Sequence, residues 1–135
     1  MNKKYFTVEE ANQLLPFLQA ELESLQGIQK EFYKTYQELQ QVRVRSKQEK
    51  ETTDVEAKKF ELECRLEFMQ IEYDMHVKSI LSTGVHVKDV DLGLIDFPST
   101  FQGEEVLLCW RQGESMVTHY HSLEEGFAGR KKIRE

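Results

Sequence analysis

The chain has 135 residues, of which 31% are charged and 39% hydrophobic, and its formal net charge at pH 7 is −6. This length fits one domain over residues 1–135, and the 10% aromatic content argues against disorder. The chain shows no apolar run of about 18 residues and no apolar signal core, and its acidic balance opposes nucleic-acid binding, so we expect a cytoplasmic protein that binds neither membranes nor nucleic acid.

The glycines divide the chain into two parts. Gly27 precedes residue 84, whereas the other six glycines lie between Gly84 and Gly129. Glycine costs a helix about 1 kcal/mol relative to alanine, so its scarcity predicts a helical hairpin over residues 7–82. Its recurrence later in the chain is typical of short strands and turns, which predicts a β-rich segment over residues 83–135.

The first helical segment begins at a capping box, in which the side chains of Thr7 and Glu10 satisfy each other's backbone N–H groups. Pro16 removes a helical hydrogen bond, so we expect a short helix near residues 8–14, a kink, and a long helix from Pro16. Apolar residues then follow a heptad spacing typical of a coiled coil or a long helical bundle. One row is Leu18, Leu25, Phe32 and Leu39, and the companion row is Leu15, Leu22 and Tyr36, interrupted by Gln29.

A second helix is predicted from near Asp54, where Thr53 and Glu56 form another capping box, to a left-handed cap at Gly84. Residues 43–53 form a polar tip between the helices, and whether this tip contacts a partner is left open. One apolar row of the second helix faces the first helix: Leu62, Leu66, Met69, Tyr73, His76 and Ile80. A second apolar face, which we expect to cover the sheet, consists of Phe60, Cys64, Phe68, Ile71 and Met75.

Three short strands are predicted in the last third of the chain, over residues 92–97, 106–110 and 117–121. Residues 85–87 are expected to extend the segment that leaves the second helix. Pro98 closes the first strand, and residues 111–115 suit a hairpin turn between the second and third strands.

Several short motifs occur in a fixed order: Phe6 to Asn12, Leu14 to Pro16, Gly93 to Pro98, Leu108 to Trp110, Gly113-Glu114, Tyr120-His121 and Gly126 to Arg130. In this order they resemble the DUF2203 family of small bacterial and archaeal proteins, and the match spans nearly the whole chain. Tyr120-His121 stands where the family commonly shows Trp-His. The resemblance supports the fold and marks positions, but it implies no activity, substrate or cofactor.

Residues two apart in a strand face the same side of a sheet, so His119 and His121 are expected to point together. With Asp96 they form a candidate site for iron, zinc or another divalent metal, which Cys109 or Glu114 could join. Ligation requires neutral imidazole, so the site would weaken below about pH 6. The alternative is a solvated strand face, in which one histidine bonds to a backbone carbonyl or to Asp96.

The segment Gly126 to Arg130 suits a small anionic ligand, because glycine N–H groups and a guanidinium both bind phosphate or carboxylate. In the alternative, Arg130 pairs internally with Asp96 or Glu114 and fixes the tail to the sheet. An Asp96–His121–Arg130 cluster extends that idea. The candidate ligand-binding residues are therefore Asp96, Trp110, Glu114, His121 and Arg130, although Trp110 also suits the core.

The sequence thus predicts an α+β protein, in which a long antiparallel helical hairpin, preceded by a short helix, packs with a small C-terminal antiparallel β-sheet. The leading functional hypothesis is a non-catalytic binding or assembly module. A homodimer is expected because an extended apolar seam stays unstable until it is covered. The alternatives are a small metal-dependent enzyme that uses His119, His121 and Asp96, and an anion or phosphorylated small-molecule binder at Arg130.

Overall fold

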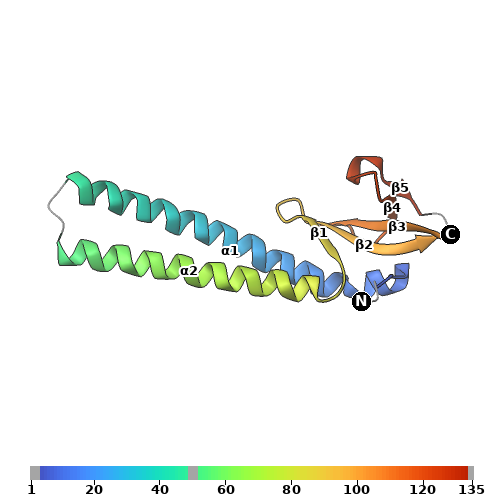
Figure 1. Cartoon of the computed structure of the whole chain (residues 1–135), viewed down its shortest axis with the longest axis horizontal. Coiled ribbons are helices and arrows are strands. Elements are labelled where there is room, and N and C mark those ends of the chain that lie inside the picture. Colours follow the sequence, from blue (N-terminus) through green and yellow to red (C-terminus); the bar gives the residue numbers. More distant parts are fainter. Residues whose placement is uncertain (1–3, 49–51, 134–135) are drawn as a thin grey trace. The chain divides into compact units, whose positions relative to one another are not determined.

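The computed structural model describes residues 4–48 and 52–133, and it confirms the predicted α+β class with a helical hairpin and an antiparallel sheet (Figure 1). Within these residues the elements are α1 (Val8–Gln48), α2 (Thr53–Leu81), β1 (His86–Asp89), β2 (Leu94–Phe101), β3 (Glu104–Arg111), β4 (His119–Ser122), a 3-10 turn (Phe127–Gly129) and β5 (Lys131–Lys132). The chain divides into two compact units. One holds Ser24–Val77, and the other holds the residues up to Glu23 together with those from Lys78 onward.

The start of α1 confirms the predicted capping box. The Glu10 N–H donates to Thr7 Oγ1 at 3.1 Å, and the Thr7 N–H donates to Glu10 Oε1 at 2.9 Å. The predicted break at Pro16 is wrong, because α1 continues through this residue to Gln48. Leu15 and Leu18 on either side of Pro16 are both buried, so the packing of a continuous helix outweighs one lost hydrogen bond.

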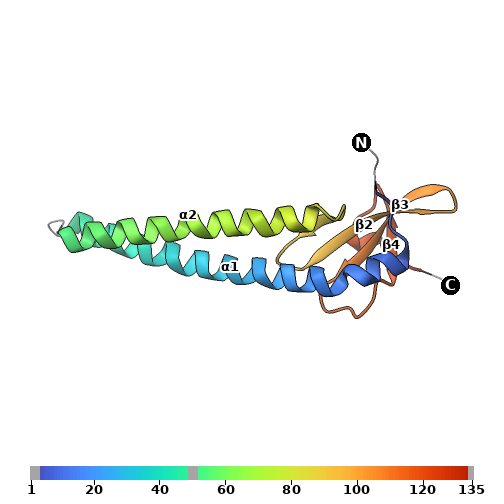
Figure 2. The same ribbon diagram turned by 90° about the horizontal axis from the view of Figure 1, so that it is seen from below.

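In the unit formed by Ser24–Val77, α1 and α2 run side by side in opposite directions (Figure 2). Leu39, Val42 and Leu62 form a buried cluster, against which Val55 and Leu66 pack. Ion pairs at 3.4 Å (Lys58 Nζ to Glu38 Oε1) and 3.9 Å (Arg43 Nη2 to Glu63 Oε1) also join the two helices. The expected companion row shifts, since Tyr36 is 42% exposed whereas Thr35 is buried.

Thr52 caps the start of α2 and Gly84 caps its end. The N-cap is Thr52 rather than Thr53, because Thr52 Oγ1 accepts the Val55 N–H at 3.3 Å. The residue three positions after Thr52 is Val55, whose side chain cannot accept a hydrogen bond, so the reciprocal bond of the predicted second capping box cannot form there. Gly84 adopts the predicted left-handed conformation at φ +97° and its N–H donates to the Leu81 carbonyl at 3.0 Å. Residues 49–51 of the predicted polar tip lie outside the described residues.

The second apolar face of α2, which we expected to cover the sheet, is exposed. Phe60 is 70% exposed, Phe68 is 68%, Ile71 is 57% and Met75 is 65%. Cys64 is half-buried. The pattern correctly indicated a second apolar face, but it gave no information on what would cover it.

The sheet is an antiparallel meander in the order β1-β2-β3-β4-β5, with two more strands than predicted. Residues 86–89 form β1, so the expected extension of the helix exit is wrong. Pro98 lies inside β2 opposite Leu107, where β1 no longer pairs with β2 and no N–H is needed on that side. A tight hairpin joins β2 to β3 through Gln102 and Gly103, both at positive φ. The predicted turn after the second predicted strand also forms, because the Glu114 N–H donates to the Arg111 carbonyl at 3.0 Å and β3 pairs antiparallel with β4.

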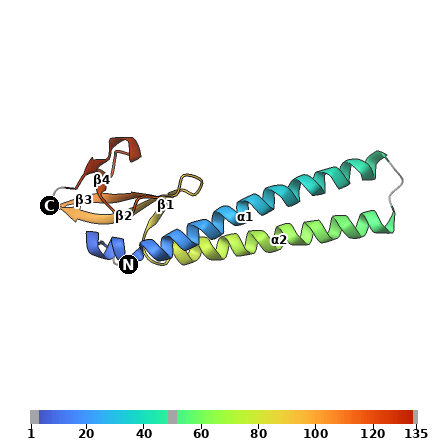
Figure 3. The ribbon, with the colours of Figure 1, turned by 180° about the vertical axis from the view of Figure 1, so that it is seen from behind.

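The residues around the start of α1 cover one face of the sheet (Figure 3). The Phe6 and Phe97 rings meet edge to face with centroids 5.5 Å apart. The Phe6 N–H donates to the Pro98 carbonyl at 2.7 Å, and Ser99 Oγ donates to the Phe6 carbonyl at 2.7 Å. Over the described residues, neither helix combines the length and hydropathy that crossing a membrane requires.

Asn12 ties α1 to the loop that precedes β4, because its Oδ1 accepts the N–H of the buried Val117 at 2.7 Å. We predict that Asn12→Ala lowers the free energy of unfolding by about 1–3 kcal/mol, since it leaves that N–H without its partner. Urea denaturation followed by circular dichroism measures the change. Gln13→Ala, at an exposed position on the same helix, is the control. A loss at Asn12 no greater than at Gln13 would contradict this role.

A buried aspartate, cysteine and histidine on one face of the sheet

The strand register brings the candidate side chains to one face. Asp96 of β2 pairs with Cys109 of β3, which pairs with His119 of β4. His121, two residues beyond His119, pairs with Leu107. Since residues two apart share a face, Asp96, Cys109 and both histidines lie on the side of the sheet opposite Phe97 and its neighbours.

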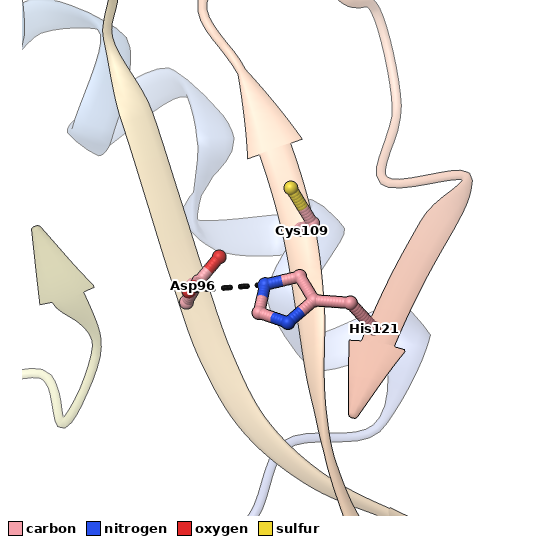
Figure 4. Close-up of side chains that lie close together, drawn as sticks. All are labelled: Asp96, Cys109 and His121. Carbon is pink, nitrogen blue, oxygen red and sulfur yellow. Dashed lines mark hydrogen bonds and ion pairs between the residues drawn. The ribbon is translucent and has the colours of Figure 1, made fainter. Parts of the chain in front are cut away.

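Three of these side chains form a compact cluster (Figure 4). One ligand atom each from Asp96, Cys109 and His121 lies within 4.8 Å of the other two. The three residues are 2%, 1% and 2% exposed. His119 is not a member of this cluster, and its Nδ1 lies 2.8 Å from Thr118 Oγ1. Of the predicted set of His119, His121 and Asp96, the structure thus brings His121 and Asp96 together with Cys109 and leaves His119 outside the cluster.

Hydrogen bonds fix the ring of His121. Its Nδ1 lies 2.8 Å from the Ser122 carbonyl oxygen, which can only accept, so Nδ1 carries a hydrogen. Its Nε2 lies 3.2 Å from Asp96 Oδ2. Two lone pairs at that distance would repel, so a proton or another cation must lie between Nε2 and the carboxylate. A backbone carbonyl that holds one ring nitrogen and leaves the other for a cation is a common arrangement of metal-binding histidines.

Burial raises the pKa of the Cys109 thiol to about 11, and the charges of Asp96 and Glu114 act in the same direction. The charge and hydrogen bonding of Arg130 act in the opposite direction but do not outweigh burial. At neutral pH, Cys109 is therefore a thiol. A thiolate at this position requires an additional positive charge, such as that of a bound metal ion.

The cluster lines a small cavity of about 220 Å³. Side chains of β1, β2, β3 and β4 line it, and a further part of the wall comes from Leu123, Glu125, Gly126 and Phe127. Glu125 Oε1 accepts the Ser122 N–H at 3.3 Å. The cavity leaves room beside the three side chains for a water molecule or a small ligand.

Arg130 belongs to a second polar pair rather than to a continuous Asp96–His121–Arg130 cluster. Its Nη1 lies 3.1 Å from Glu114 Oε2, and its guanidinium lies 4.2 Å from the centroid of the Phe127 ring. Burial raises the pKa of Glu114. Hydrogen bonds from the Arg111 N–H and from Arg130, together with the charges of Arg130 and His119, lower it by more than burial raises it, so the pKa is below its ordinary value. Arg130 thus pairs internally, as one of the two sequence interpretations expected.

The remaining candidate, Trp110, lies on the other face of the sheet. It is 1% exposed, pairs with Ile95, and its Nε1 donates to the Glu114 carbonyl at 2.9 Å. Trp110 is therefore a core residue and not part of the cavity lining. Cys109 was weighed from the sequence as an added ligand. Its central place became clear with the side-chain positions, whereas Glu125 gave no signal in the sequence and Phe127 was marked there only as part of the Gly126 to Arg130 segment.

The chain matches the family described as "Uncharacterized conserved protein (DUF2203)" over residues 4–133. It therefore belongs to this family, and the resemblance found in the sequence is confirmed. No curated protein and no solved structure matches the chain.

The raised pKa of Cys109 predicts a stability loss at high pH. Because the folded protein holds this proton more tightly than the unfolded chain, the contribution is complete below pH about 9 and is lost as pH rises to about 11. The expected size is about 2–3 kcal/mol. Urea unfolding of the metal-free protein between these pH values measures the slope. Cys109→Ala should flatten the slope and Cys64→Ala should not, so equal slopes in the two variants would contradict the assignment.

Proposed function

We propose that this member of the DUF2203 family is a non-catalytic binding module whose C-terminal sheet holds a divalent transition metal ion on Asp96, Cys109 and His121. One observation carries the proposal. A carboxylate, a thiol and an imidazole, all nearly inaccessible to solvent, place ligand atoms within 4.8 Å of one another. Buried polar groups of these kinds are costly unless each is paired or binds a cation.

The donor set favours zinc. Zinc binds sulfur, nitrogen and oxygen ligands at about 2.0–2.3 Å, and its open sites combine three protein ligands with one exchangeable position. In a tetrahedral site, ligand atoms lie roughly 3.3–3.7 Å apart, and His121 Nε2 and Asp96 Oδ2 are already 3.2 Å apart. The cavity beside the cluster supplies space for the fourth ligand.

A metal ion would replace protons in this site. It would displace the one between His121 and Asp96 and the one on Cys109, whose pKa is raised to about 11. Metal binding therefore releases protons, and the affinity should rise with pH. The same exchange makes the site weak in acid, as the sequence predicted for a histidine site.

The geometry supports binding more than catalysis by a nucleophile. A cysteine nucleophile needs a base with a free nitrogen, and both ring nitrogens of His121 are engaged by Ser122 and Asp96. A metal-dependent enzyme that uses His119 lacks support as well, because His119 stands outside the cluster. An anion at Arg130 would have to compete with the Glu114 carboxylate for the guanidinium.

Two further features belong to the proposal. Both cysteines are free thiols, which fits a reducing compartment such as the cytoplasm. The heptad seam with buried Leu25 and Leu39 supports coiled-coil packing of α1 with α2. The predicted homodimer rests on the sequence argument, and light scattering over a wide concentration range tests it. A 16.0 kDa species throughout would count against a dimer.

We predict that the reduced protein binds one zinc or cobalt ion per chain. The cobalt-loaded protein should show a sulfur-to-cobalt charge-transfer band that Cys109→Ser removes and Cys64→Ser keeps. Competition with a chromophoric chelator should show an affinity loss of at least about tenfold for His121→Gln, whereas His119→Gln should change it by less than about twofold. Elemental analysis of the same samples gives the stoichiometry.

Asp96→Asn separates metal binding from folding. The asparagine amide can donate to neutral His121 Nε2, which keeps a hydrogen bond in the place of the ion pair, but it removes the charged ligand. We expect a folded variant with strongly reduced metal affinity. Failure of the wild-type chain to take up zinc, iron, cobalt or manganese under reducing conditions would end the proposal. Loss of metal in His119→Gln but not in His121→Gln would instead favour a site built on His119.

A further inference from the structure

The outer face of α2 is a continuous apolar stripe in the unit formed by Ser24–Val77. Its residues are spaced four, four, three and four apart: Phe60, Cys64, Phe68, Ile71 and Met75. The four large side chains are between 57% and 70% exposed. The stripe is about 22 Å long at 1.5 Å per residue. Exposed apolar patches of this extent commonly mark sites of protein interaction.

The stripe points away from α1. At 100° per residue, its mean direction is opposite to that of Leu62, which is fully buried, and of Leu66, which packs against the α1–α2 cluster. The face is therefore additional to the hairpin seam. A second helix could lie along it without disturbing the contacts between α1 and α2.

Acidic residues line both sides of the stripe. Helical geometry places on one side Glu56, Glu63, Glu67 and Asp74, and on the other side Asp54, Glu61 and Glu72. These are all seven acidic residues of α2. Two of them are also ion-paired, since Glu61 lies 3.7 Å from Lys58 Nζ and Glu63 lies 3.9 Å from Arg43 Nη2. Lys58 and Lys59 lie toward α1, which leaves Arg65 and Lys78 as the bases of α2 that border the stripe.

These charges decide between two kinds of occupant. If a second copy docked through the same stripe, acidic flanks would face acidic flanks, and like charges in an interface oppose association. A helix whose apolar stripe is flanked by lysine or arginine would bring opposite charges together. We propose that the outer face of α2 binds a basic amphipathic helix of another protein.

A synthetic peptide of three heptads, with leucine and isoleucine in the apolar positions and lysine in the flanking positions, is the probe. A matched peptide carries glutamate in place of lysine. Fluorescence anisotropy should show that the lysine peptide binds the full chain at least about tenfold more tightly than the glutamate peptide. Raising the salt concentration from about 0.05 M to about 0.5 M should weaken this binding, because the flanking charges are exposed.

The double substitution Phe68→Ser and Ile71→Ser should weaken binding of the lysine peptide at least about tenfold. Val44→Ser, which changes a 53% exposed apolar residue of α1, should leave it unchanged. Circular dichroism confirms that each variant is folded. Equal binding of both peptides, or no effect of the double substitution, would overturn the proposal. So would a dimer of the free chain that the same double substitution dissociates, because the occupant would then be a second copy.

Discussion

The contact between His121 Nε2 and Asp96 Oδ2 is the interaction on which the candidate site depends. It joins β4 to β2 across β3, and both side chains are nearly inaccessible to solvent. Because the other ring nitrogen is held by the Ser122 carbonyl, the contact is stable only with a cation between the two groups. A proton between the two groups satisfies this requirement. A metal ion would also satisfy it, and Cys109 is close enough to be a further ligand.

Cys109 connects the two polar pairs of the sheet. Burial disfavours its thiolate most, the charges of Asp96 and Glu114 act in the same direction, and Arg130 favours the thiolate, so the thiol is the stable form. Arg130 is itself paired with Glu114 and stacks on Phe127, so its charge is shared with the Glu114 carboxylate. The protein therefore lacks enough fixed positive charge to ionise Cys109. A bound metal would supply that charge, so the proposed metal binding would be coupled to ionisation of the thiol.

The elements were largely readable from the sequence, whereas the site was readable only in part. The Thr7 cap, the row with the buried Leu18, Leu25 and Leu39, and the Gly84 cap are local signals that the structure confirms, whereas Tyr36 of the companion row is exposed. The continuity of α1 through Pro16 depends on tertiary packing, which local rules do not contain. The site depends on register, because a slip of one residue turns every side chain to the other face. Alternation placed His119 and His121 on one face and the register sets His119 opposite Cys109, so only the side-chain positions show that His121 is the histidine that joins Asp96 and Cys109.

The two apolar faces of α2 show what a hydrophobic pattern alone does not distinguish. Both faces have helical spacing, yet their charged surroundings differ. Toward α1, Lys58 meets Glu38 and Arg43 meets Glu63, so cations and anions alternate across the contact within the chain. Around Phe60 and Phe68, the flanks are predominantly acidic. A face made for the chain's own helix carries both partners of its ion pairs, whereas a face flanked mainly by one sign of charge lacks the complementary one. The outer face of α2 resembles the second kind, since Glu61 and Glu63 have basic partners in the chain but the flanks remain mainly acidic, and a basic helix of another molecule would supply the complementary charge.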